Sequence, residues 1–413
     1  MERISYKPLF SLPVIVAALG YFVDIYDLLL FGIVRKPSMT ALGLNPETVG
    51  VSILNWQMGG LLLGGILWGI LGDKRGRLSV LFGSILLYSL ANIACGFLPY
   101  FPKEDVAVWY AILRFVAGVG LAGELGAGIT LVSESLPKEL RAIGTSLVAG
   151  FGLLGAVVAN FTVKLSGDWT VAYFIGGGMG IALLLLRVGV AESGIFKETV
   201  VNTAIKRGNF FSFFTNRDRF IRYIRCIGIG LPTWFCIGVL AMLANQFGKA
   251  LGIPEEVSAG DAIMYGYIGI SAGDFFSGFL SHWLRSRKKA IIWMMAFTLV
   301  SVVWILYGGI KTTGMYYALC VWFGFGTGYW AMFVTVGAEQ FGTNIRSTAA
   351  TTIPNIVRGT VPLMYFAYEA LNPVTGVIHA GAIVGLVCFA IGIYCTASIA
   401  ETHGRDLDFT END

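Results

Sequence analysis

The chain has 413 residues, of which 56% are hydrophobic and only 13% charged, and its mean hydropathy is +0.72. A soluble globular protein carries about 25% charged residues, so this composition excludes a soluble domain and predicts a chain solvated mainly by lipid. The net charge of +4 and the lack of a long basic tract argue against nucleic acid as a partner.

Apolar stretches of about twenty residues recur along the whole chain, and this is the length that a helix needs to cross a bilayer. A window of about nineteen residues predicts twelve spans, near residues 10–34, 48–71, 78–98, 107–133, 141–164, 169–190, 222–248, 262–283, 290–310, 314–338, 346–370 and 377–399. We therefore expect an all-α integral membrane protein, because a transmembrane barrel would show ~10-residue alternating segments instead.

The basic residues predict how these spans are oriented. With both termini in the cytoplasm, 21 of the 29 Lys and Arg residues lie on the cytoplasmic side and six lie outside, with Arg114 and Arg358 within spans. This asymmetry satisfies the positive-inside rule. The predicted location is the inner membrane of a prokaryote.

A charged stretch divides the chain into two similar halves. The predicted organisation is an N-terminal six-helix bundle (1–190), a cytoplasmic linker (191–221), a C-terminal six-helix bundle (222–400) and a cytoplasmic tail (401–413). "ESLPKELR" at 134–141 is answered by "EQFGTNIR" at 339–346, and "GILGDKRGR" at 69–77 by "GFLSHWLRSR" at 278–287. Parallel repeats of this kind are typical of the major facilitator fold.

Several charged residues stand inside predicted spans, where an ionised group costs at least a few kcal/mol. Asp24 and Asp27, in "GYFVDIYDLLLFG", are three residues apart and share a helix face. They are candidates for carrying a proton, and the alternative is that both are fixed in salt bridges and hydrogen bonds. Glu124 lies among glycines and is a candidate proton relay or substrate contact, against a buried hydrogen-bonded residue.

Arg358 lies close to the bilayer midplane, at the depth where substrates bind in this kind of fold. Because Arg pairs with carboxylates through two parallel hydrogen bonds, it predicts a site for an anionic substrate group. The alternative is a fixed pair with an acid such as Asp274. Further residues that we expect to line the site are Asn355, Trp56, Gln57, Trp234, Trp330 and Tyr365.

"GILGDKRGRLSVL" resembles the loop between the second and third helices of major facilitator superfamily transporters, except that Leu78 replaces a basic residue. "RFVAGVGLAGE" and "VDIYDLLLFG" are similar to the fourth and first helices of the sugar porter and metabolite:proton symporter branch. The resemblance implies two six-helix bundles that work by alternating access. It also implies that Asp27 and Arg114 form a proton-coupling pair.

The same resemblance implies a conformational latch at the cytoplasmic ends of the helices. In this sequence its members are Gly69, Asp73, Arg77, Glu134, Arg141, Glu339 and Arg346.

The sequence thus predicts a secondary active transporter of a small polar organic solute, with a carboxylate or zwitterion favoured, working as a proton symporter. The alternatives are a proton-coupled sugar transporter, or an antiporter or exporter of a small solute or cation. A membrane-embedded enzyme would need a nucleophile with its base or a metal cluster. Three scattered histidines and six separate cysteines provide neither. We expect no metal or other cofactor, and a monomer whose partners are its substrate, protons and lipid.

Overall fold

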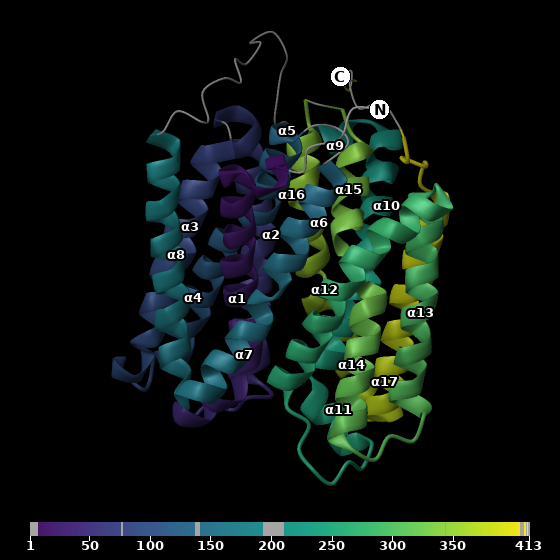
Figure 1. Ribbon diagram of the computed structural model, residues 1–413. Coiled ribbons are helices and arrows are strands. Elements are labelled where there is room, and N and C mark those ends of the chain that lie inside the picture. Colours follow the sequence, from purple (N-terminus) through teal and green to yellow (C-terminus); the bar gives the residue numbers. More distant parts are fainter. Residues whose placement is uncertain are drawn as a thin grey trace.

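The computed structural model describes residues 7–75, 77–136, 141–192, 210–342 and 344–404, together with Phe409 and Glu411. Within these residues every regular element is a helix. Figure 1 shows the helices of the first half of the chain gathered on one side of the molecule and those of the second half on the other. The predicted all-α architecture of two helical bundles is confirmed.

The first bundle is built from α1 (Leu12–Ala41), α2 (Val49–Arg75), α3 (Arg77–Gly96), α4 (Val106–Leu121), α5 (Glu124–Ser135), α6 (Arg141–Leu153), α7 (Gly155–Ser166) and α8 (Trp169–Glu192). The second bundle begins with α9 (Ser212–Thr215), α10 (Arg217–Trp234), the π-helix η3 (Phe235–Ala241) and α11 (Ala244–Ala250). It continues with α12 (Ala259–Leu284), α13 (Arg287–Tyr307), α14 (Thr313–Thr327), α15 (Trp330–Glu339), α16 (Arg346–Gly359) and α17 (Val361–Ser398). Short 3-10 turns stand at Lys7–Phe10 and Leu98–Tyr100. Most of the predicted linker, residues 193–209, lies outside the described residues.

Among the described residues nine helical stretches are long and apolar enough to cross a membrane. One of them, Thr348–Ser398, is 51 residues long. At 1.5 Å per residue it would measure about 77 Å, more than twice the ~30 Å hydrocarbon core. Gly376, with φ 79° and ψ 163°, divides it into two spans. Adding α3 and the more polar α12 makes the structure consistent with the twelve predicted spans.

Four spans are interrupted near their middle. The breaks fall between α4 and α5, α6 and α7, α14 and α15, and α16 and α17. Each is only one or two residues long. Ala122 and Gly123 keep helical backbone angles, whereas Gly328, with ψ 33°, departs from them. Interrupted backbone at membrane depth is tolerated where protein or an aqueous cavity surrounds it, so these breaks mark the interior of the protein.

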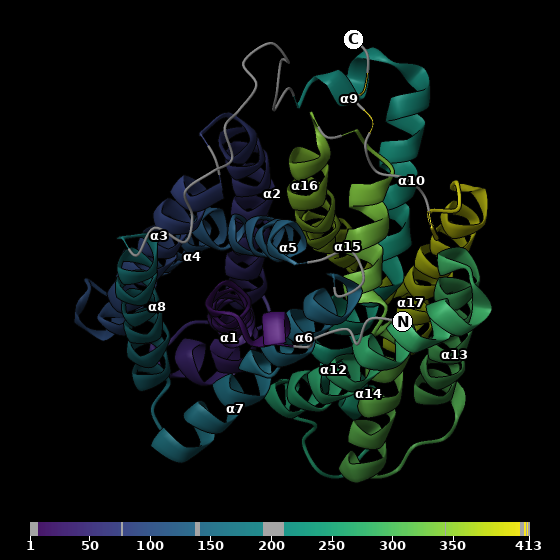
Figure 2. The same ribbon diagram turned by 45° about the horizontal axis from the view of Figure 1, so that its top comes forward.

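We call the end of the molecule where α1 begins and α17 ends the terminal end, at the top of Figure 1, and the opposite end the far end. The two halves touch at both ends. At the far end Lys164 pairs with Asp261, and Arg35 donates to the main-chain oxygen of Met242 over 3.0 Å. Toward the terminal end α16 packs against α2 and α5, as Figure 2 shows for α5 and α16.

Candidate functional site

Arg114 on α4 is fully buried and holds three other helices of the first bundle. Its guanidinium donates to Gln57 Oε1 (3.2 Å) on α2 and to Asn92 Oδ1 (2.7 Å) on α3. A third bond reaches the main-chain oxygen of Asp27 on α1 (3.2 Å), and the Tyr173 ring lies 5.5 Å from the charge. Arg114 is therefore the polar centre of this bundle.

Asp27 meets Arg114 through its main chain and not through its carboxylate. Its side chain is fully buried, and neither carboxylate oxygen accepts a hydrogen bond of ordinary geometry from the described residues. One oxygen lies so close to Gly176 on α8 that a Cβ there would come within 2.2 Å of it. The predicted meeting of these helix faces occurs, and the carboxylate lies within electrostatic reach of Arg114 and Asn92.

Asp24 is buried on α1 without a hydrogen-bond partner. Its side chain is fully buried, and neither of its oxygens accepts a hydrogen bond in the described structure. Arg358 of the second bundle, Glu124 and Asp27 lie within electrostatic range of it. The two aspartates, one helical turn apart, thus have different surroundings: Asp27 lies beside Arg114, and Asp24 lies within range of Arg358.

Arg358 is the corresponding cation of the second bundle. It lies at the end of α16, directly before the break to α17, and only 1% of it is exposed. Trp234 and Trp330 each place a ring centroid 5.8 Å from its guanidinium carbon. Asn355 accepts its one hydrogen bond among the described residues, at 3.3 Å, and its Nε–H has none. The Arg358 guanidinium lies beside two aromatic rings and has an N–H without an acceptor in the described chain, so it can bind a further acceptor.

Asn355 connects the two bundles at this level. Its Nδ2 donates over 2.8 Å both to Thr351 within α16 and to the main-chain oxygen of Ala122 at the α4–α5 break. Because Asn355 also accepts the bond from Arg358, it joins the predicted substrate arginine directly to the first bundle. The structure therefore brings Asn355, Trp234 and Trp330 together at Arg358, and Asp24 lies within electrostatic range of this group.

Glu124 pairs with a residue that the sequence analysis had placed among the cytoplasmic charges. Both of its oxygens accept from the Arg187 guanidinium, one of them at 3.0 Å, and both residues are buried. Gly20 allows this pair to lie against α1, because a Cβ there would come within 2.1 Å of both side chains. Of the two interpretations left open, this geometry favours the buried, hydrogen-bonded residue.

Asp274 on α12 does not pair with Arg358 through a hydrogen bond. Its Oδ1 accepts the backbone N–H of Ala331 at 3.0 Å, at the start of α15, and its Oδ2 has no partner in the described chain. The sequence gives no sign of this hydrogen bond, because Ala331 lies 57 residues after Asp274 along the chain. The Asp274 Oδ1 thus satisfies one of the backbone N–H groups left free at the start of α15, at the α14–α15 break.

Three of the residues predicted to line the site have other placements. Gln57 accepts a hydrogen bond from Arg114 through its Oε1 and donates one from its Nε2 to the Leu28 carbonyl (2.8 Å). Tyr365 donates to the Gly238 carbonyl of the π-helix at 2.5 Å. Trp56 is 54% exposed on the outer face of α2, where it packs on Phe115, because the other face of α2 is turned toward the protein. We leave Trp56 out of the proposed site.

The side chains of four predicted latch residues, Asp73, Arg77, Glu134 and Arg141, lie outside the described residues. Gly69 stands where α2 approaches α16, 3.4 Å from Thr352 when a Cβ is added. In the second half Glu339 accepts from Arg287 at 2.7 Å, and Arg346 donates to the Phe341 carbonyl at 3.2 Å. Glu339 and Arg346 thus belong to one polar cluster, in which Arg287 holds the carboxylate.

Glu401, just beyond α17, belongs to the same end of the molecule. It accepts hydrogen bonds from the Ser286 hydroxyl (2.5 Å) and from the backbone N–H of Arg287 (3.0 Å), at the start of α13. Partial burial opposes its ionisation, but these donors outweigh it and hold the pKa of Glu401 below its usual range. The carboxylate therefore ties the end of α17 to the start of α13.

The sequence also matches known proteins. The family model of the Major Facilitator Superfamily matches residues 17–358. The chain belongs to the major facilitator superfamily. This membership confirms the predicted family and the predicted transport function, and it places the chain among transporters and not enzymes.

Relatives within the superfamily are named as transporters of organic solutes. The chain is 28% identical to a putative metabolite transport protein of Haemophilus influenzae, over 83% of this chain and 84% of the relative. It is 25% identical to a probable 4-methylmuconolactone transporter of Cupriavidus pinatubonensis, over 94% and 90%. A niacin transporter of Acinetobacter baylyi is 32% identical, over 43% of this chain and 40% of its own.

A solved structure shares the fold. The proton:xylose symporter XylE, solved with 6-bromo-6-deoxy-D-glucose bound, matches with a TM-score of 0.68 over 98% of each chain, at 17% sequence identity. This likeness confirms the major facilitator fold.

Proposed function

We propose that this superfamily member is a proton-coupled symporter of a small organic carboxylate, working by alternating access. Arg358 binds the substrate carboxylate, and Asp24 and Asp27 carry the coupling proton. The observation that carries the proposal is that Asp24 and Arg358 are both buried with hydrogen-bonding capacity unused by the described residues. Neither oxygen of Asp24 accepts a hydrogen bond, the Nε–H of Arg358 has no acceptor, and the two charges lie within electrostatic range of one another.

The pair suggests how proton and substrate are coupled. When Asp24 is ionised it competes with the substrate carboxylate for Arg358, because both are anions drawn to the same guanidinium. A proton on Asp24 removes this competition and leaves Arg358 free for the substrate. An unpaired buried carboxylate is costly, so the proton also lowers the cost of closing the halves around the site.

The surroundings of Arg358 favour a carboxylate with a flat apolar body. Trp234 and Trp330 lie 6.4 Å apart at their ring centroids, beside the guanidinium. Aromatic rings bind planar apolar groups well, and two curated relatives are a niacin transporter and a benzoate transport protein. We therefore propose aromatic or similarly compact carboxylates as the first substrates to test.

The remaining features of the proposal follow from the sequence. We propose an inner-membrane monomer of a prokaryote with both chain termini in the cytoplasm, so that the terminal end is the cytoplasmic end. The latch residues named above hold that end closed while the far end is open. Gln57 supports Arg114 and Tyr365 supports the π-helix, and neither is proposed to contact substrate directly.

The proposal is tested with purified protein in liposomes that contain a pH-sensitive dye, with the membrane potential clamped. Benzoate and nicotinate are added as carboxylates, betaine as a zwitterion and xylose as a sugar. We expect internal acidification with the carboxylates only. Arg358→Gln abolishes it, whereas the matched control Arg285→Gln, at an exposed arginine, leaves it unchanged.

Other outcomes would redirect the assignment. Acidification with betaine or xylose alone would replace the carboxylate by a zwitterion or a sugar. Uptake of labelled benzoate without any pH change would contradict proton symport. Uptake by Arg358→Gln at the wild-type rate would remove Arg358 from the substrate site.

A further inference from the structure

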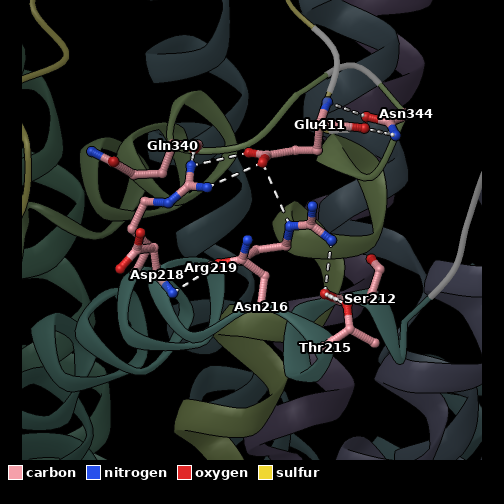
Figure 3. A network of polar contacts seen from close by, with 9 residues as sticks. Ser212, Thr215, Asn216, Asp218, Arg219, Gln340, Asn344 and Glu411 are labelled. Atoms are coloured by element: carbon pink, nitrogen blue, oxygen red, sulfur yellow. Dashed lines mark hydrogen bonds and ion pairs between the residues drawn. The ribbon is translucent and has the colours of Figure 1, made fainter. Parts of the chain in front are cut away.

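The C-terminal tail contacts the protein through Glu411, and its Phe409 ring lies 6.0 Å from the Arg346 guanidinium carbon. The carboxylate of Glu411 accepts two hydrogen bonds from Arg222 on α10, at 3.0 and 3.1 Å, as Figure 3 shows. The Nε of Arg219, one turn earlier on α10, lies 3.5 Å from the same carboxylate. Two parallel bonds from one guanidinium are the strongest way in which a protein binds a carboxylate.

Asn344 binds the main chain of the same tail residue. Its Oδ1 accepts the N–H of Glu411 and its Nδ2 donates to the Glu411 carbonyl, both at 3.0 Å. A side-chain amide that satisfies both main-chain groups of one residue recognises a peptide. Arginines and asparagine together therefore select an acidic residue within a peptide, and not a free anion alone.

The site is supported by contacts that do not involve the tail. Arg219 is 3% exposed and donates to the Ser212 carbonyl at 2.9 Å. Arg222 donates to the Gln340 carbonyl at 2.6 Å and stands over the Phe341 ring, 5.3 Å from its centroid. Figure 3 shows Ser212 and Gln340 around the two guanidinium groups. The arginines are held in place before a ligand arrives.

The tail contact joins α10 to the segment that leads into α16. Arg219 and Arg222 lie on α10, while Asn344 lies two residues before α16. The α16 helix packs against α2 and α5 of the first bundle toward the terminal end. A Cβ on Gly126 of α5 would come within 2.8 Å of the Thr351 Cα on α16. Opening of the terminal end must separate this contact.

We propose that Arg219, Arg222 and Asn344 form a binding site for an acidic peptide segment, that the chain's own tail occupies it through Glu411, and that this occupancy favours the state with the terminal end closed. The tail fixes the start of α16 to α10 and so restrains the helix that has to move. This regulation goes beyond the transport chemistry and depends on neither the substrate nor the proton.

The first test measures the closed contact directly. All six native cysteines are buried, so a Thr351→Cys variant of the full chain carries one thiol that becomes reactive when α16 leaves α5. Its rate of modification by a charged maleimide is measured in lipid nanodiscs. We expect Glu411→Gln to raise this rate about tenfold, within the 5–150-fold range of coupled sites. Glu104→Gln, an exposed carboxylate at the far end, serves as the charge-matched control and leaves the rate unchanged.

Asn344→Ala tests the same site without changing charge. It should raise the rate as much as Glu411→Gln, and the double variant should be no faster than either, because both changes release the same segment. Equal rates in wild type and both single variants would overturn the proposal. Additive effects of the two variants would also overturn it, since they would mean two independent contacts.

A second test separates ligand binding from a merely structural tail. The chain is ended after Gly404, and the peptide RDLDFTEND, residues 405–413, is added in solution. The shortened protein should react fast, and the peptide should restore slow modification in a saturable way. The same peptide with Gln at position 411 should need at least a tenfold higher concentration, because a neutral amide loses the charge-assisted bonds. Equal action of both peptides, or of neither, would refute the acidic-peptide site.

Discussion

The guanidinium of Arg114 donates to the main-chain oxygen of Asp27 over 3.2 Å, and the Asp27 carboxylate takes no part in that bond. The arginine therefore fixes the position of α1 whatever side chain stands at residue 27. A carboxylate placed beside a fixed arginine, but not bonded to it, can gain or lose a proton without disturbing the helix contact.

This geometry leads to a prediction for Asp27→Asn. Because the main-chain bond survives, the free energy of unfolding should change by less than about 1 kcal/mol, as for substitutions that break no buried network. Gradient-driven uptake should be lost, whereas exchange of labelled for unlabelled substrate should persist. Thermal unfolding in detergent and the two liposome assays measure this. Loss of exchange together with uptake would mean that Asp27 serves structure or substrate binding.

The Glu124–Arg187 pair predicts a large loss of stability. Glu124→Gln leaves the buried Arg187 charge without its partner, which costs about 3–5 kcal/mol in comparable pairs. The double variant Glu124→Gln with Arg187→Met should recover most of that loss, since no charge then remains buried. Chemical denaturation of the purified variants provides the comparison. Glu256→Gln, which breaks the exposed pair with Lys36, should cost no more than about 1 kcal/mol; a similar cost at both sites would contradict the prediction.

The close approach of Gly126 to Thr351 predicts a conformational effect. A Cβ at Gly126 would lie 2.1 Å from the Thr351 hydroxyl and 2.8 Å from its Cα. Such overpacking costs about 1–3 kcal/mol, here only in the state with the terminal end closed. Gly126→Ala should therefore slow uptake roughly 5- to 150-fold while the protein stays folded. Gly178→Ala, where no atom lies within 4 Å of the added Cβ, should transport normally.

The pH dependence of stability is predicted at Glu401. Its pKa is lowered in the folded protein, so its stabilisation is fully present above the ordinary carboxyl pKa of about 4.3. That stabilisation is lost as the pH falls through the folded value. Wild type should be more stable than Glu401→Gln at pH 7, and the difference should shrink below about pH 4. Melting temperatures of both proteins across this pH range test the prediction. A stability difference that grows on acidification would contradict the lowered pKa of Glu401.

Hydropathy was enough to predict most of the spans, because each apolar helix must cover the bilayer thickness. It also located the interior charges, since Asp24, Asp27, Arg114 and Arg358 stand out against their neighbours. Their partners were not predictable. Residues three apart point about 60° apart around a helix, which is enough to place the Asp27 carboxylate beside α8 and to give Asp24 different neighbours.

Long-range pairs were the other part that the sequence could not provide. Glu124 and Arg187 are 63 residues apart, and Arg287 and Glu339 are 52 residues apart, so only the packing of the helices brings each pair together. The exposure of Trp56 could not be predicted either, because a tryptophan in an apolar helix gives no sign of whether it faces lipid or the protein interior.

The main-chain bond between Arg114 and Asp27 has an evolutionary consequence. A descendant of this chain that replaced Asp27 by a neutral residue would keep the packing of its first bundle and still fold. With the coupling role that we propose for Asp27, energy coupling would then be separable from the fold by a change of one codon. On that proposal, the same scaffold serves as a concentrating pump where solute is scarce and as a passive carrier where it is plentiful.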